Sequence, residues 1–235
     1  MEEWLLFLRG PVFRLAIVIF ILGLGRELFL AVYGVVSAYR KANDRDLPWK
    51  QMITGALSWL IPAKRLFTSN RKAHGFLTFM MHVGVILVPV FLLDHILLWE
   101  NGLGIRWPAI PQYLADVVTL LTILVVAGLI ISRAFSKTAR PLSKAQDYLL
   151  LILLFFIFGS GFIASKPWNP ISYEASMIIH TLAGNALLIS APFTKLAHIA
   201  VYPIKMFSVE LAWKFPSRAG EEVALTLDGK EVRPT

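Results

Sequence analysis

The stretch Ala73–Leu93, AHGFLTFMMHVGVILVPVFLL, decides the fold class because it contains no aspartate, glutamate, lysine or arginine. A helix rises 1.5 Å per residue, so about 20 apolar residues cross the ~30 Å hydrocarbon core of a bilayer. Two further charge-free stretches of similar length follow it, Tyr148–Ser165 and Ala175–Thr194. These runs predict an integral membrane protein.

Two weaker segments complete the set of spans. The segment from about Pro11 to Tyr39 is long but interrupted by Arg26 and Glu27, and the segment 117–132 is extended by uncharged residues before Asp116. The chain is 57% hydrophobic and 16% charged, whereas soluble domains hold about 25% charged residues. We predict an all-α integral membrane protein with five transmembrane helices in a bundle. The predicted spans are about 11–39, 73–99, 112–133, 147–166 and 175–204.

Basic residues gather in alternate loops. Segments 39–72 and 133–144 and the part after Pro203 are rich in lysine and arginine, whereas 100–112 and 166–174 hold one basic residue each. Lysine and arginine are retained on the cytoplasmic side. The pattern predicts an N-terminus outside and a C-terminus in the cytoplasm. It also explains the net charge of +8 without nucleic acid.

The ends and the first long loop carry further expectations. The chain opens with Met1-Glu2-Glu3, which is acidic, and no small-residue cleavage site follows, so we expect no secretory signal. We expect a transmembrane domain over 1–210 and a polar cytoplasmic tail over 211–235. The segment Trp49–Phe67 mixes apolar and basic residues, as does a helix that lies on the inner leaflet.

All five histidines lie in or at the edges of the second and fifth spans. They are His74, His82, His95, His180 and His198. One membrane histidine can simply bridge helices by a hydrogen bond, but ionisable residues inside a membrane are functional candidates. The chain has no cysteine, which excludes cysteine-ligated iron–sulfur clusters and covalently attached c-type haem on this chain.

The spacing of His180 and His198 suggests two cofactors. They are 18 residues apart, so one continuous helix would place them on the same face, about 27 Å apart. No single metal bridges that distance. The second span runs antiparallel, which sets His95 opposite His180 and His82 opposite His198. Because Pro89 kinks the second span, His74 remains an alternative to His82.

The segment His180–Pro203, HTLAGNALLISAPFTKLAHIAVYP, resembles the last helix of the gamma subunit of respiratory nitrate reductase, a dihaem cytochrome b. The second span is similar more loosely, through His82 with its following Gly84 and through His95, at a spacing of 13 that is longer than in that family. The residues of the last helix that keep the family register are His180, Gly184, Pro192, Phe193, Thr194, Lys195, Leu196, His198, Ile199 and Pro203.

The resemblance implies two haem b groups, one held by His95 and His180 and the other by His82 and His198. Bis-imidazole ligation leaves no open iron position, so such haems transfer electrons rather than bind oxygen. The chain would oxidise menaquinol or another quinol near the outer face. It would pass electrons to a cytoplasmic iron–sulfur subunit that serves a catalytic subunit, or work in reverse and reduce quinone. Because similar subunits serve several respiratory complexes, the resemblance implies quinol chemistry more strongly than nitrate.

Charged residues near the outer end are candidates for the quinone site. Asp94, beside His95, is the predicted base that accepts a quinol proton. Glu100 and Arg106, in the adjoining loop, are further quinone-site candidates, with a solvated loop as the alternative. Asp116 is expected to cap or anchor the third span.

Two cations are candidates for neutralising haem propionates, whose charge is costly to bury unpaired. Lys195 lies one turn before His198 and matches a basic position of the family. Arg26 is the second, with a simple pair to Glu27 or to a neighbouring helix as the alternative.

Two other functions remain open. A proton transporter could use histidines as a relay, which explains buried histidines but not the register of His180 and His198. A membrane anchor could hold haem without quinone turnover.

Overall fold

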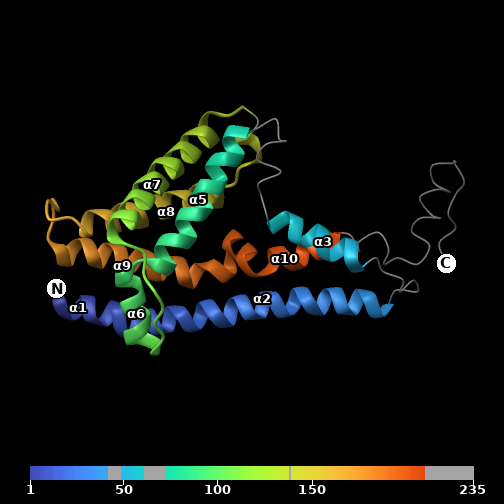
Figure 1. Ribbon diagram of the computed structural model, residues 1–235, viewed down its shortest axis with the longest axis horizontal. Coiled ribbons are helices and arrows are strands. Elements are labelled where there is room, and N and C mark those ends of the chain that lie inside the picture. The colour runs from blue at the N-terminus through green and yellow to red at the C-terminus, as the bar shows by residue number, and fades with distance from the viewer. Residues whose placement is uncertain (42–48, 61–71, 138, 210–235) are drawn as a thin grey trace, which may run out of the picture. The chain divides into compact units, whose positions relative to one another are not determined.

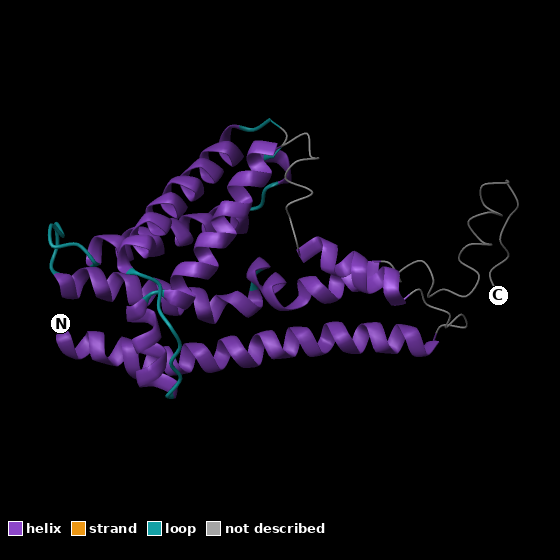
Figure 2. Cartoon of the chain, viewed as in Figure 1, coloured by secondary structure: helices purple, strands orange, loops and turns teal. Residues whose placement is uncertain are grey.

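The computed structural model describes residues 1–41, 49–60, 72–137 and 139–209, and within these ranges it is helical, without a strand (Figures 1 and 2). Five helices are long and apolar enough to cross a membrane: Glu2–Arg40, Ala73–Phe91, Gln112–Phe135, Ala145–Ala164 and Tyr173–Phe193. The predicted all-α architecture with five spans is confirmed, and the chain is a multi-pass membrane protein. The predicted tail 211–235 lies outside the described residues.

The chain divides into two compact units, and we describe each by itself. The first comprises the described residues of 1–21 and 72–195, and the second those of 22–60 and 196–209. The first contains α1 (Glu2–Phe7), the π-helix η1 (Leu8–Val12), the start of α2 (Phe13–Lys41), α5 (Lys72–Phe91), α6 (Leu93–Leu103), α7 (Gln112–Phe135), α8 (Ala145–Ala164) and α9 (Tyr173–Ser190). The second contains the rest of α2, then α3 (Trp49–Leu60) and α10 (His198–Val209), and α3 packs against α10.

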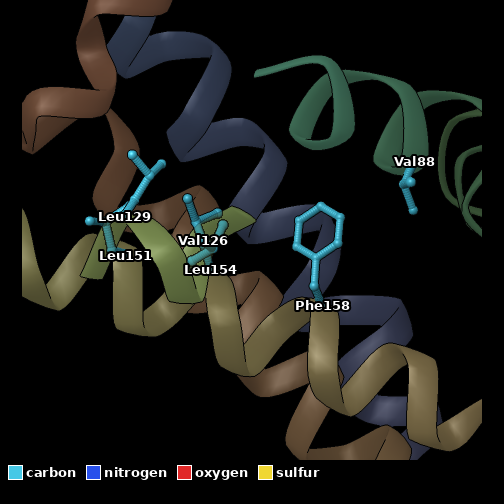
Figure 3. Packing of buried hydrophobic residues seen from close by; sticks show 6 residues of the cluster. All are labelled: Val88, Val126, Leu129, Leu151, Leu154 and Phe158. Atoms are coloured by element: carbon cyan, nitrogen blue, oxygen red, sulfur yellow. The ribbon is translucent and has the colours of Figure 1, made fainter. Parts of the chain in front are cut away.

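Helix packing in the first unit follows chain order. Helix α7 contacts both α5 and α8, and α8 contacts α9 (Figure 1). The apolar core lies at these contacts, with Leu129 beside Leu151 and Val126 beside Leu154 (Figure 3). Its further members are Val88 and Phe158. Many large apolar side chains face outward instead, as lipid contact requires of a spanning helix.

Small side chains bring α5 and α7 close together. A Cβ atom added at Gly84 would lie 1.8 Å from Oγ1 of Thr122, so no larger residue fits without moving a helix. Thr122 is buried, and its hydroxyl donates to the carbonyl of Val118 at 2.7 Å. Close approach at small residues is a usual way for helices to associate in membranes.

The spans predicted as 112–133 and 147–166 are confirmed to within about two residues as α7 and α8. The first span is longer than predicted, since helical structure runs from Glu2 to Lys41 with a π-helix around Pro11. Within the predicted interfacial segment, Trp49–Leu60 is helical, and 61–67 lie outside the described residues.

The second span, for which Pro89 predicted a kink, is interrupted, and the prediction of one continuous fifth helix is wrong. The second breaks at Leu92, whose extended backbone separates α5 from α6. The fifth breaks after Ser190, where the 3₁₀ turns Ala191–Phe193 and Lys195–Ala197 precede α10. Pro192 explains the break after Ser190, because it has no N–H to donate and its ring clashes with the preceding turn. Pro89 lies inside α5, which continues past it to Phe91.

Candidate functional site

Two histidines come together in the first unit. His95 is in α6 and His180 is in α9, and their imidazole rings lie with centroids 6.0 Å apart and planes within 2° of parallel. The antiparallel spans predicted this juxtaposition. Their assignment as ligands stays a prediction.

The break at Leu92 sets the position of His95. Helix α6 begins one residue later, so His95 lies in its first turn rather than on a continuation of α5. Ile96 is fully buried and anchors this turn. The Nδ1 atom of His95 is buried and has no hydrogen-bond partner among the described residues. An unsatisfied buried polar group costs about 1–3 kcal/mol, so His95 is a candidate for binding a ligand.

Helix α8 packs against the ring of His180 through Ile157, Ser160 and Gly161, which we call the seat of this ring. Nδ1 of His180 donates to the carbonyl of Ile157 at 3.0 Å, and the hydroxyl of Ser160 lies 3.4 Å from the same nitrogen. A Cβ atom at Gly161 would lie 2.8 Å from Cε1 of the ring, so only glycine allows this approach. A carbonyl that accepts from Nδ1 fixes the tautomer and leaves the Nε2 lone pair to bind a metal.

The pair fits the axial ligation of a haem. The part of the chain that the structure describes has no group of three or more histidine, cysteine, aspartate or glutamate residues that could hold a metal ion. A haem needs only two protein ligands, because the porphyrin supplies four nitrogens. Metal–imidazole bonds of about 2.0 Å place two coordinating rings with centroids roughly 6 Å apart. The observed centroid separation of 6.0 Å meets this requirement.

His82 shows the same local pattern as His180. It is half-buried in α5, and its Nδ1 donates to the carbonyl of Thr78 at 2.7 Å. His74 is exposed in the first turn of α5. His198 is exposed at the start of α10, in the second unit. The pairing of His82 with His198, and the choice between His82 and His74, therefore stay predictions.

The prediction that His180 and His198 lie on the same face of one helix is wrong. It required one helix from the first histidine to the second, whereas α9 ends at Ser190 and α10 begins at His198. The backbone at Thr194 is extended. The residues from His180 to His198 therefore do not form five helical turns of 3.6 residues each. The two histidines belong to different units.

The predicted quinone-site residues lie in and after α6. Asp94 is exposed in the first turn of α6, where the helix dipole favours a carboxylate. Glu100 and Arg106 form an exposed ion pair of 3.3 Å across a turn at Gly104, whose φ is 72°. The indole of Trp107 donates to the carbonyl of Val90 at 2.7 Å and ties this loop to the end of α5.

The predicted propionate partners already hold carboxylates. Lys195 pairs with Asp147, which also lies 3.7 Å from Arg133. Arg26, in the second unit, pairs with Glu27 at 2.6 Å, which is the alternative considered for it.

Asp116 does not cap α7, whose N-cap is Pro111. It pairs with Lys166 and accepts a hydrogen bond from Gln112 at 3.2 Å. Asp116 therefore anchors α7 to the end of α8, as the second of the two roles predicted for it.

Sequence reasoning missed two groups around His180. One is the seat on α8, whose only signal was the Gly159-Ser160-Gly161 motif in an apolar helix. The other is Arg9, a cation just before the first predicted span, which donates to the hydroxyl of Tyr173 at 3.2 Å.

Comparison with known proteins finds a relative of similar extent. The chain is 28% identical over 202 residues to a protein of Nitratidesulfovibrio vulgaris, and the alignment covers 83% of this chain and 87% of that protein. No family model matches the chain. No solved structure matches it.

Proposed function

We propose that the chain is a membrane cytochrome b subunit of a respiratory oxidoreductase that exchanges electrons with quinone. The observation that carries the proposal is the pair His95 and His180, with parallel rings 6.0 Å apart. Similarity of the segment His180–Pro203 to the nitrate reductase gamma subunit supports haem b as the group they hold.

In this proposal the imidazoles of His95 and His180 would hold one haem. The carbonyl of Ile157 holds Nδ1 of His180, and hydrogen bonding of this kind raises the basicity of the opposite nitrogen. His82 and His198 hold the second haem, and the Thr78 carbonyl plays the same part for His82. A haem bound there would supply one-electron transfer.

Quinol oxidation releases two electrons and two protons, so the site needs a proton acceptor beside the electron acceptor. Asp94 precedes His95 in the chain and is exposed, so a quinol hydroxyl can reach it and transfer a proton. The ion pair of Glu100 and Arg106 borders the same segment. The protein thereby moves protons to the side that holds α6.

The loop charges support an N-terminus outside and a C-terminus in the cytoplasm of a prokaryotic inner membrane. Electrons would then pass from the haem of His180 to that of His198. They would leave through a cytoplasmic iron–sulfur subunit to a catalytic subunit, or travel the opposite way to reduce quinone.

The test is an optical spectrum of the purified protein followed by quinol addition. We expect a b-type α-band on dithionite reduction, with two haems per chain, and rapid haem reduction by a menaquinol analogue. A reduced spectrum without the α-band would remove the proposal and favour a histidine relay. Haem that quinol cannot reduce, and that cannot reduce quinone, would favour a membrane anchor.

A further inference from the structure

The N-terminal segment is fastened to α9 on both sides of His180. The amide of Asn185, which is buried, donates to the carbonyl of Leu8 at 3.1 Å. Arg9 donates to the hydroxyl of Tyr173 at 3.2 Å. Both contacts involve the π-helix Leu8–Val12, and π-helices within longer helices occur frequently at functional sites.

These contacts bring Arg9 to the side of α9 that carries His180. Tyr173 and His180 are seven residues apart within the uninterrupted α9, so they lie on nearly the same face, about 10.5 Å apart along the axis. Arg9 therefore lies at the beginning of α9, on the side of that helix that carries His180.

The charge of Arg9 lacks a carboxylate partner in the described part of the chain. The neighbouring cations at this end are paired, Arg106 with Glu100 and Lys166 with Asp116. Arg9 is half-buried, and the group to which it donates is the neutral hydroxyl of Tyr173. A half-buried cation is stabilised by an anion, and its planar guanidinium binds a carboxylate through two parallel hydrogen bonds.

We propose that Arg9, oriented by Tyr173, binds the propionate carboxylates of the haem held by His95 and His180. The inference rests on the haem site proposed above. Propionates are negative groups at the edge of the porphyrin, and burying them unpaired is costly. The alternative is an arginine that extends to a lipid phosphate at the membrane surface.

The test is a redox titration of both haems in the full chain with Arg9→Gln, Arg9→Lys and Arg14→Gln. Loss of the positive charge disfavours the reduced iron, which carries one positive charge less. The midpoint potential of the His180 haem should therefore fall in Arg9→Gln and stay near the wild-type value in Arg9→Lys. Arg14, exposed five residues later, is the matched control, and its variant should leave both potentials unchanged.

A second readout is the pH dependence of the same potential. Without Arg9, the pKa of a propionate rises toward neutrality, so reduction of the haem is accompanied by proton uptake. The potential of Arg9→Gln should therefore fall with rising pH near neutrality, more steeply than in the wild type. Tyr173→Phe should show a smaller change in the same direction, which provides the test if Arg9→Gln does not fold.

The haem concerned is identified as the one that His180→Ala loses. Unchanged potential and pH profile in Arg9→Gln, or an equal effect of Arg14→Gln, would overturn the inference while leaving the haem site intact. A change confined to binding of vesicles with anionic phospholipid would assign Arg9 to lipid instead. Wild-type protein that binds no haem would overturn the proposed function itself.

Discussion

The two predicted histidine pairs look equivalent in the sequence and differ in the structure. His95 and His180 lie in one unit, with parallel rings and a seat on a third helix. His82 and His198 lie in different units, and the segment between His180 and His198 is not one helix. The first pair is therefore positioned by packing within a single unit. Two histidine pairs that look equivalent in the sequence can therefore differ in how well the fold positions their rings to bind a ligand.

The largest expected effect is loss of an axial ligand. His95→Ala and His180→Ala should each lose the same haem, because one imidazole cannot hold a bis-ligated haem firmly, and His198→Ala should lose the other. Haem content per chain, measured with the optical spectrum, should fall from two to one in each variant. Loss of different haems in His95→Ala and His180→Ala would break the first pair.

Gly84→Ala should produce the largest loss of stability. The added Cβ would meet Thr122 Oγ1 at 1.8 Å, and overpacking of this kind costs typically about 1–3 kcal/mol. The change would be read as a lower midpoint of thermal unfolding in detergent. Gly128→Ala is the matched control on α7, since its Cβ would meet Leu77 at an ordinary 3.9 Å. Equal stability of the two variants would contradict the close approach of α5 and α7.

Gly161→Ala should act on one haem rather than on the fold. Its Cβ would lie 2.8 Å from the ring of His180, and the ring would have to turn away from the Ile157 carbonyl. We expect a shifted midpoint potential and altered low-spin electron paramagnetic resonance of the His180 haem, with the His198 haem unchanged. Gly159→Ala, two residues earlier on α8 with open space around its Cβ, should leave both signals unaltered. An equal shift in both haems would show a general distortion instead of a seat.

The smallest structural effect is expected at Arg106. Its ion pair with Glu100 is exposed, and exposed pairs contribute at most about 1 kcal/mol. Arg106→Gln should therefore leave unfolding and both haem potentials unchanged. A several-fold slower reduction by a menaquinol analogue would then report a role in quinone binding. Unchanged reduction rates would indicate that the ion pair of Glu100 and Arg106 only holds the loop in place.

Sequence alone predicted the spans whose ends coincide with charges. Helices α7 and α8 lie within about two residues of the predicted limits, because the length of a charge-free run is set by the thickness of the bilayer. It also selected His95 and His180 as partners, since antiparallel spans bring the end of one opposite the beginning of the other.

The sequence did not predict where the breaks at Leu92 and after Ser190 would fall, although Pro89 predicted a kink in the second span and Pro192 lies next to the second break. A proline within a membrane helix can kink it or end it, and neighbouring helices decide which by satisfying the freed backbone groups. The seat at Gly161 and the position of Arg9 likewise depend on contacts between helices far apart in sequence.

The sequence by itself therefore determined that this chain crosses a membrane five times and which histidines are its candidate ligands, because both follow from local composition. Only the tertiary structure decided that the rings of His95 and His180 meet, that the Ile157 carbonyl holds the ring of His180, and that Arg9 contacts the beginning of α9. Those features arise where α6, α8, α9 and the N-terminal segment come together, and no single segment encodes that meeting.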